Sequence, residues 1–192
     1  MTPPLAHSRR DIAEPGIVED AAQRRAVEAL QQVFDELAAE RRRHEGLLGR
    51  FRRPRAVPGL YMWGGVGRGK TYLMDVFYDA LPAEGKLRMH FHRFMQYVHR
   101  QMRARQGEKN PLESIGDELA DQARVLCFDE FFVTDITDAM ILAGLMEVLF
   151  RRSMTLVATS NIHPDHLYYN GLQRQRFLPA IDLIKDHCRV LN

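Results

Sequence analysis

The sequence predicts an α/β fold, in which a parallel sheet is covered by helices on both faces. The first observation behind this prediction is the alternation, after Pro58, of short apolar runs with longer segments of helical periodicity. The second is a glycine-rich turn between the first apolar run and the helix after it, in GLYMWGGVGRGKTYLMD (59–75). The third is an ordinary globular balance of 192 residues, 45% hydrophobic and 27% charged, which suits one substantial core better than two domains.

The first two regions precede the sheet. Residues 1–17 contain prolines and lack periodicity, so they predict a loose N-terminal tail. Residues 18–57 are expected to form a helical segment and a basic linker. The helix is predicted from Glu19 to about Glu45, because four apolar side chains fall on one stripe: Val27, Leu30, Phe34 and Leu37.

The linker is rich in arginine, with seven arginines between Arg41 and Arg55. Basic residues interleaved with Phe51 can follow a phosphate backbone. A solvated helix end with a linker is the more common meaning of such a run, and it is favoured here. Pro54 and Pro58 end the segment.

Residues 58–192 form the third region, the α/β core. Strands are expected in GLYMW (59–63), LRMHFH (87–92), RVLCFDE (124–130), MTLVATSN (154–161) and CRVLN (188–192). Helices are expected from about Lys70 to Ala80, from about Phe94, in NPLESIGDELADQA (110–123) and DITDAMILAGLMEVLF (135–150), and, shorter, around Asp165 and Pro179. Asp135 and Asp138 are placed as the N-cap and the third residue of the 135–150 helix.

The glycine-rich turn predicts a phosphate site. GGVGRGKT matches the Walker A pattern G-x-x-x-x-G-K-[ST] between a strand and a helix, the context that supports it. Its glycines let successive N–H groups point into one anion nest, and the helix that opens there adds its dipole. Lys70 reaches the β- and γ-phosphates, and the Thr71 hydroxyl ligates Mg²⁺. The expected nucleotide-binding residues are Gly64, Gly65, Val66, Gly67, Arg68, Gly69, Lys70 and Thr71.

Polar residues at two later strand ends extend this site. Asp129 follows the apolar run VLCF, so it is aimed at the carboxyl edge of the sheet, where Mg²⁺ sits. Glu130 is placed to polarise the attacking water as a general base. Asn161 ends the next strand and could hold that water or the γ-phosphate. The alternatives are a surface acid pair and an ordinary loop start.

Several segments together resemble AAA+ ATPases, and more narrowly the family of the bacterial cell-division ATPase ZapE and its mitochondrial Afg-type relatives. They are GLYMWGGVGRGKTYLMD, MHFHRFM, VLCFDEFFVTDITDAMIL, TLVATSN and YNGLQRQRFLPAI. The resemblance begins at about Ala21 and runs to the end of the chain. It implies an AAA+ core, a P-loop NTPase fold with a five-stranded parallel sheet in the order 5-1-4-3-2.

The resemblance also implies roles for residues outside the P-loop. Asn161 matches the sensor-1 position. Arg174 falls where an arginine finger is expected to reach a neighbour's γ-phosphate, which requires a ring or at least a dimer. Arg176 competes for that role, and a solvated surface arginine is the structural alternative. The family continues past the fifth strand into a helical lid, whereas this sequence stops at Asn192, so the lid is expected to be missing.

The location is expected to be cytoplasmic. Cys127 and Cys188 lie far apart in apolar runs, which is typical of buried free thiols in a reducing compartment. The N-terminus lacks the apolar region of a secretory signal. The most apolar helical run, AMILAGLMEVLF (139–150), carries Glu147 and is too short to cross a bilayer.

The leading hypothesis is an ATPase that uses ATP and Mg²⁺ to remodel or regulate a protein partner. The resemblance implies the division machinery, namely FtsZ filaments near the inner membrane, so peripheral membrane association stays open. A helicase-loader-like ATPase on DNA is an alternative, although the mild net charge of +2 disfavours nucleic acid. A third possibility is an ATP-binding module without turnover, because the lid is absent.

Overall fold

The computed structural model describes residues 21–45, 51, 53–65 and 69–192. The expected tail, 1–17, and three of the expected nucleotide-binding residues, Val66, Gly67 and Arg68, lie outside these ranges.

A five-stranded parallel sheet forms the centre of the molecule. Its strands are β1 (Gly59–Trp63), β2 (Gly85–His90), β3 (Ala123–Asp129), β4 (Thr155–Ser160) and β5 (Cys188–Leu191). They are arranged in the order β2-β3-β4-β1-β5, which confirms the expected 5-1-4-3-2 order read from the other edge. The strand that carries TLVATS therefore lies between the strand before the P-loop and the strand that ends in Asp129.

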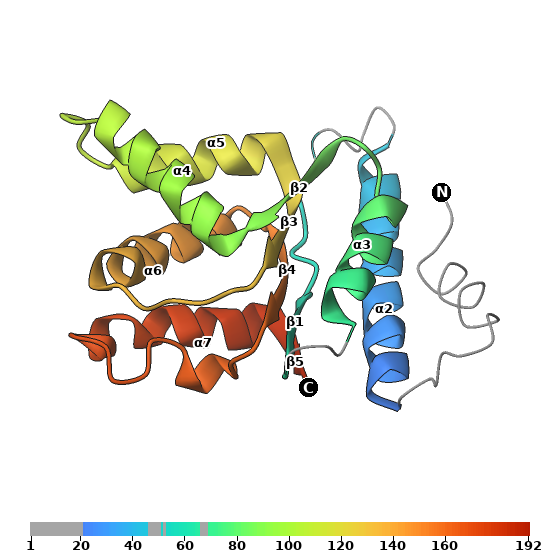
Figure 1. Ribbon diagram of the computed structural model, residues 1–192. Helices are drawn as coiled ribbons and strands as arrows, with labels where there is room; N and C mark the ends of the chain where they lie inside the picture. Colours follow the sequence, from blue (N-terminus) through green and yellow to red (C-terminus); the bar gives the residue numbers. More distant parts are fainter. Residues whose placement is uncertain (1–20, 46–50, 52, 66–68) are drawn as a thin grey trace.

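Helices cover both faces of the sheet (Figure 1). One face carries α2 (Ala21–His44) and α3 (Lys70–Ala80). The other carries α4 (Phe91–Ala104), α5 (Pro111–Gln122), α6 (Ile136–Arg151) and α7 (Leu178–His187). Two 3₁₀ turns, η2 (Pro164–His166) and η3 (Arg174–Arg176), lie between β4 and α7. The predicted α/β class is confirmed.

The two faces enclose separate cores, because successive strand residues point to opposite sides. Leu60, Met62 and Val157 pack against α2 and α3. Tyr61 and Phe128 pack with the other helices. Burial on both faces explains why the strands are nearly continuous apolar runs. Cys127 and Cys188 are buried free thiols, as predicted, and burial raises the pKa of each to about 12.

The expected boundary between the second strand and its helix is wrong by a few residues. LRMHFH was expected as a strand through His92, but β2 ends at His90 and α4 begins at Phe91. The helix starts early because Phe91 opens an apolar stripe at spacings of three and four, together with Phe94, Met95 and Val98, all buried. His92 is therefore on a helix rather than on the strand with His90.

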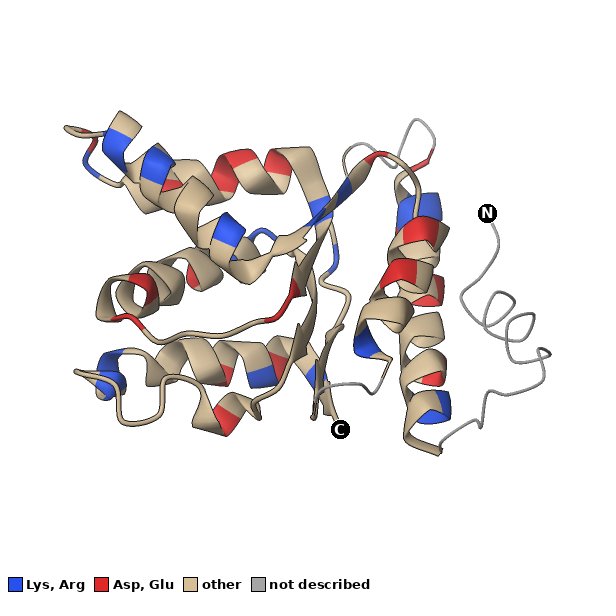
Figure 2. Cartoon of the chain, viewed as in Figure 1, with Lys and Arg blue, Asp and Glu red and all other residues tan. Residues whose placement is uncertain are grey.

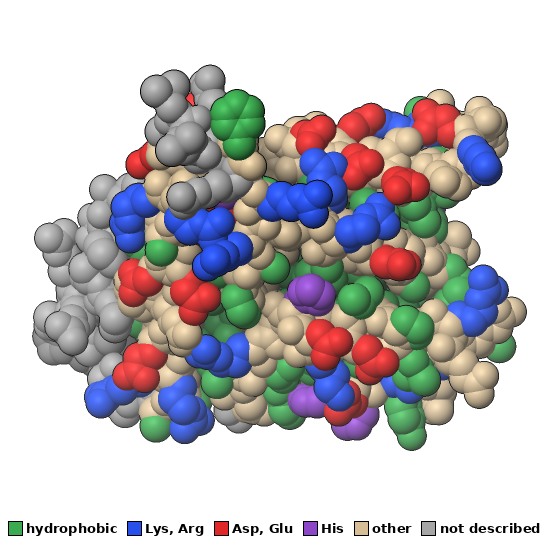
Figure 3. All heavy atoms as spheres, turned by 180° about the vertical axis from the view of Figure 1, so that it is seen from behind, with side chains coloured by type: hydrophobic (Ala, Val, Ile, Leu, Met, Phe, Trp, Pro, Cys, Tyr) green, Lys and Arg blue, Asp and Glu red, His purple; other side chains and the backbone are tan. Residues whose placement is uncertain are grey.

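Charges of both signs are mixed over the surface. Basic residues lie at both ends of α2, with acidic residues between them (Figure 2). The face seen from behind shows basic and acidic side chains interspersed, with hydrophobic side chains among them (Figure 3). None of the helices within the described ranges is long and apolar enough to cross a membrane.

Candidate nucleotide-binding site

The P-loop leaves the carboxyl end of β1 with a backbone that only glycine adopts readily. Gly64 has φ 144° and Gly69 has φ 71°, values in the region that favours glycine. The Gly64 N–H donates to the Ser160 carbonyl at 3.2 Å, which ties the start of the loop to the end of β4. A Cβ at Gly65 would meet no described atom within 4 Å.

Lys70 is the first residue of α3 and turns back over the loop. Its Nζ donates to the Gly64 carbonyl at 2.7 Å and to the Gly65 carbonyl at 2.8 Å. Gly69 precedes the helix and supplies no side-chain cap, and the start of α3 carries the helix dipole that favours an anion. Thr71 is exposed in the same turn. Ammonium, amides and hydroxyl therefore gather at one helix start.

Asp129 is the last residue of β3 and is buried, with 6% of its surface exposed. Arg88 on β2 holds both of its carboxylate oxygens, through Nε to Oδ2 at 2.7 Å and Nη2 to Oδ1 at 3.1 Å. The third nitrogen of Arg88, Nη1, donates to Asp75 on α3 at 2.5 Å. Burial opposes the charge on Arg88, but the two aspartates outweigh it and raise the pKa of the guanidinium.

Glu130 follows β3 in a left-handed conformation, with φ 56°. Such a backbone costs a non-glycine residue about 1 kcal/mol or more, and residues of this kind cluster at functional sites. The Glu130 N–H donates to Thr159 Oγ1 at 3.2 Å, while its side chain is 79% exposed. His90 Nδ1 lies 3.9 Å from Glu130 Oε2. The carboxylate thus points outward beside the end of β2.

The ends of β3 and β4 are fastened to each other just past Glu130. The Phe131 N–H donates to the Thr159 carbonyl at 2.8 Å, and Ser160 Oγ donates to the Phe131 carbonyl at 2.7 Å. Asn161 follows Ser160 directly and is exposed. Lys70, Asp129, Glu130 and Asn161 therefore all come from the carboxyl edge of the sheet, where parallel α/β sheets bind ligands.

Arg174 is bound within its own chain. Its Nη2 donates to the Asp165 carbonyl at 2.6 Å and its Nε to the Leu167 carbonyl at 3.4 Å, and its guanidinium lies 5.9 Å from the centre of the Tyr169 ring. Arg176 is exposed and donates to Gln173 Oε1 at 2.9 Å. The choice between these two arginines as the finger stays open.

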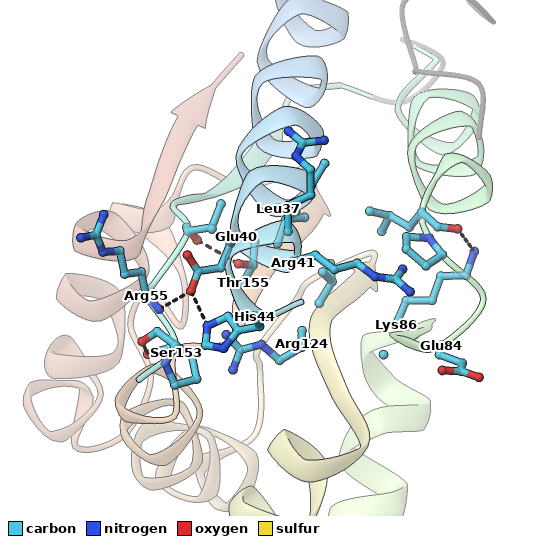
Figure 4. Close-up of a pocket in the computed structure, with 18 of the residues that line it drawn as sticks. Leu37, Glu40, Arg41, His44, Arg55, Glu84, Lys86, Arg124, Ser153 and Thr155 are labelled. Atoms are coloured by element: carbon cyan, nitrogen blue, oxygen red, sulfur yellow. Dashed lines mark hydrogen bonds and ion pairs between the residues drawn. The ribbon is translucent and has the colours of Figure 1, made fainter. Parts of the chain in front are cut away.

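A cavity of about 880 Å³ lies at the other end of the sheet, where the strands begin (Figure 4). Gly85 at the start of β2 and Thr155 at the start of β4 line it, together with the last turns of α2. Parallel strands put their two ends at opposite edges, so this cavity is separate from the Lys70 site. It collects part of the arginine-rich segment, including Arg41 and Arg55.

Glu40 organises that cavity. It accepts from the Arg55 backbone N–H at 2.7 Å and lies 3.0 Å from His44 Nε2 and 3.1 Å from Arg43 Nη1. Burial opposes its charge, but these partners outweigh burial and lower the pKa of Glu40. Arg41 pairs with Glu45 at 3.8 Å. Part of the basic segment is therefore neutralised within the chain.

Arg88 was missed by the sequence reasoning. It stands on a strand expected to be structural, and its meaning depends on which strand lies beside it. In the β2–β3 register Arg88 pairs with Cys127 and His90 with Asp129. The expected strand order places this strand beside the one that ends in Asp129, but the order alone does not give the register that brings Arg88 to Asp129.

The residues fit a magnesium–nucleotide complex. A glycine-rich loop, an ammonium and a helix start suit phosphates. The carboxylate of Asp129 and the hydroxyl of Thr71 are the oxygen ligands that Mg²⁺ prefers. Sheet order, P-loop and acidic strand end together define a P-loop ATPase core of the AAA+ class.

The AFG1-like ATPase family model matches residues 1–192, so the chain belongs to the AFG1-like ATPase family. Over 185 residues it is 56% identical to the cell division protein ZapE of Escherichia coli (strain K12), covering 90% of this chain and 49% of that protein. It is 42% identical over 151 residues to Lactation elevated protein 1 homolog B of Danio rerio, covering 73% and 30%. The chain thus spans about half the length of ZapE and 30% of the length of Lactation elevated protein 1 homolog B.

Solved structures share the fold. DnaI superposes with a TM-score of 0.63 at 15% identity, covering 91% of this chain and 86% of that one. AMPPCP-bound DnaA from Aquifex aeolicus gives a TM-score of 0.58 at 13% identity, covering 92% and 48%. At these identities the similarity establishes architecture alone.

Proposed function

We propose that this chain binds Mg·ATP at the Lys70 site and hydrolyses it. The observation that carries the proposal is the arrangement at the carboxyl edge of the sheet. There Lys70 closes over Gly64 and Gly65, and the buried Asp129 stands beside the outward-facing Glu130. Membership of the AFG1-like ATPase family supports the same chemistry.

Each residue has one task in this proposal. The amides of the loop and the start of α3 bind the phosphates, and Lys70 exchanges its two carbonyl partners for phosphate oxygens. Thr71 and Asp129 would hold the metal, and a bound metal would neutralise charge that develops on the phosphates. Glu130 accepts a proton from water aligned with the terminal phosphate, and Asn161 helps to hold that water.

Two substitutions separate binding from turnover. Lys70→Ala is expected to weaken ATP binding about 10- to 100-fold, because a charge-assisted contact contributes about 1.5–3 kcal/mol. Glu130→Gln is expected to keep binding and to lower turnover about 10²- to 10⁴-fold, the usual contribution of a general base. Calorimetry measures the first effect and phosphate release the second.

Lys109→Ala is the matched control, because Lys109 is an exposed lysine in the turn between α4 and α5. It should leave both measurements at the parental level. Parental turnover by Glu130→Gln would contradict the role of Glu130. A parent protein that binds ATP without releasing phosphate would instead establish the binding-module alternative.

We also propose that ATP turnover serves the bacterial division machinery, with FtsZ filaments as the candidate partner in the cytoplasm. The support is the similarity to ZapE, whose name places it in cell division. Glu130→Gln with bound ATP should sediment with FtsZ polymers, while Lys70→Ala should remain in the supernatant. Equal sedimentation of both variants would contradict a nucleotide-dependent interaction with FtsZ.

A DNA-associated ATPase is the second candidate, because three described arginines of the arginine-rich segment, Arg41, Arg42 and Arg55, line the cavity at one end of the sheet. Pairing of Arg41 and Arg43 with carboxylates reduces the charge left for phosphates. Binding to single-stranded DNA that weakens with salt, and is lost when Arg53 and Arg55 become alanine, would support this candidate. Absence of binding at low salt would remove it.

A further inference from the structure

Arg88 occupies the carboxylate that the metal would use. Its Nε and Nη2 bind the two oxygens of Asp129, at 2.7 and 3.1 Å. The pair is well shielded, since the Arg88 side chain is 19% exposed and that of Asp129 is 9% exposed. A two-pronged pair of this kind also fixes the orientation of the carboxylate.

The same guanidinium has a second partner in a different element. Nη1 donates to Asp75 Oδ1 at 2.5 Å, and the Asp75 side chain is 52% exposed at the surface of α3. Asp75 lies five positions beyond Lys70 on the helix that begins at the P-loop. Arg88 therefore connects the end of β3 to the helix that binds the phosphates.

Arg88 and a divalent cation compete for Asp129. A metal ion bound to this carboxylate would place two positive groups against the same oxygens, and the shielded position makes their repulsion strong. Asp75 can relieve this repulsion, because it binds a separate nitrogen of Arg88. Arg88 can release Asp129 and remain paired with Asp75, so its charge is not left without a partner.

We propose that Arg88 is a positioning residue that holds Asp129 while no metal is bound and releases it to Mg·nucleotide, keeping Asp75 as its partner. Arg88 thereby neutralises and orients Asp129 in the metal-free protein, and a metal ion must compete with Arg88 for the Asp129 carboxylate. This inference rests on the proposed nucleotide function, and it adds a residue that sets the metal dependence of the site.

The test compares two affinities in each protein. Calorimetry measures the binding of AMPPCP with Mg²⁺ and of AMPPCP in EDTA. The dissociation constant in EDTA divided by the one with Mg²⁺ reports the preference for the metal complex. Arg88→Gln removes the competitor, so this ratio should rise about tenfold or more over the parent. A general loss of structure would weaken both affinities and leave the ratio unchanged.

Arg88→Lys supplies an intermediate. A lysine ammonium keeps the charge but lacks the planar fork, so it competes less well for the carboxylate, and the ratio should rise by a few-fold. If Arg88→Gln fails to fold, this variant carries the test. In both variants the melting temperature should also fall further below that of the parent in EDTA than in Mg·AMPPCP, because Arg88 acts chiefly in the metal-free state.

Arg152→Gln is the matched control. Arg152 also bridges two aspartates, Asp117 and Asp121, each at 2.6 Å, but it does so on the surface between α5 and α6. Its ratio should equal that of the parent. An unchanged or lower ratio in both Arg88 variants overturns the inference. A parent that binds neither form of AMPPCP refutes the proposed function, and this inference falls with it.

Discussion

Gly59 is the position in the sheet where a single methyl group has the least room. It begins β1, and a Cβ there would lie 1.8 Å from the Leu156 carbonyl oxygen on β4. The obstacle is backbone within a paired strand, so it cannot rotate away. Gly59→Ala should therefore lower the free energy of unfolding by about 3 kcal/mol, at the upper end of overpacking effects.

Urea unfolding followed by circular dichroism measures this effect. Gly65→Ala is the control, because a Cβ there meets no described atom within 4 Å, and it should change stability by less than about 0.5 kcal/mol. Equal stability of the two variants would mean that β1 and β4 can separate at little cost.

At the scale of residues, the site residues that belong to one contiguous motif could be identified from the sequence. Gly64, Gly69 and Lys70 could be placed because their spacing within one loop is itself the signal. Arg88 could not, since its meaning arises from a neighbour 41 positions away on another strand. The contact between His90 and Glu130 was missed for the same reason.

At the scale of elements, the predicted types of element were right and their predicted boundaries were imprecise. The alternation of Leu87, Met89 and Phe91 is equally consistent with a longer strand, and only burial of the stripe from Phe91 to Val98 decides for a helix. Helix starts with a specific cap were better predicted. Asp135 was expected as the cap of α6, and its carboxylate accepts from the N–H groups of Thr137 and Asp138.

That cap yields a prediction with a definite sign in pH. The Asp138 N–H bond is the main cause that lowers the pKa of Asp135, so the stabilisation is present above the pKa of the unfolded chain, about 3.9. It is lost as pH falls through the lower folded value. At pH 7, Asp135→Ala should lower Tm by about 2–4 °C, from the loss of a helix cap.

Asp135→Asn separates the cap from its charge. An asparagine oxygen accepts the same bonds at every pH, so this variant should lie near the parent at pH 7 and lose less stability than the parent on acidification. Thermal unfolding at pH 7 and at about pH 3 compares the three proteins. An alanine variant that melts with the parent at pH 7 would show that packing alone starts α6.

At the scale of the whole molecule, topology assembles the site from distant segments. Lys70, Asp129 and Asn161 come to the same edge of the sheet because β1, β4 and β3 are neighbours in that order, although they are first, fourth and third along the chain. Periodicity predicted five strands, but nothing in it ranks their neighbours. The strand order was available only from the resemblance to a family, whereas the shared edge of these residues followed from their positions at the ends of predicted parallel strands.

An arginine finger requires self-association, because one subunit then completes the site of another. If Arg174 acts on a neighbour, mixing Arg174→Ala with Glu130→Gln should recover turnover that neither variant has alone. In a head-to-tail assembly with random mixing, about a quarter of the sites combine an intact Glu130 with an intact neighbouring arginine. Phosphate release from the equimolar mixture should thus approach about a quarter of the parental rate.

The same mixture made with Arg176→Ala decides between the two arginines. Arg174 must leave the Asp165 and Leu167 carbonyls to reach a neighbour, whereas Arg176 is already exposed. An arginine finger contributes about 10³–10⁵ to the rate, so the correct variant should be nearly inactive alone and regain activity only in the mixture. An Arg174→Ala protein that loses stability and gains nothing on mixing would assign Arg174 to its own loop, because its bonds to η2 would then be its whole role.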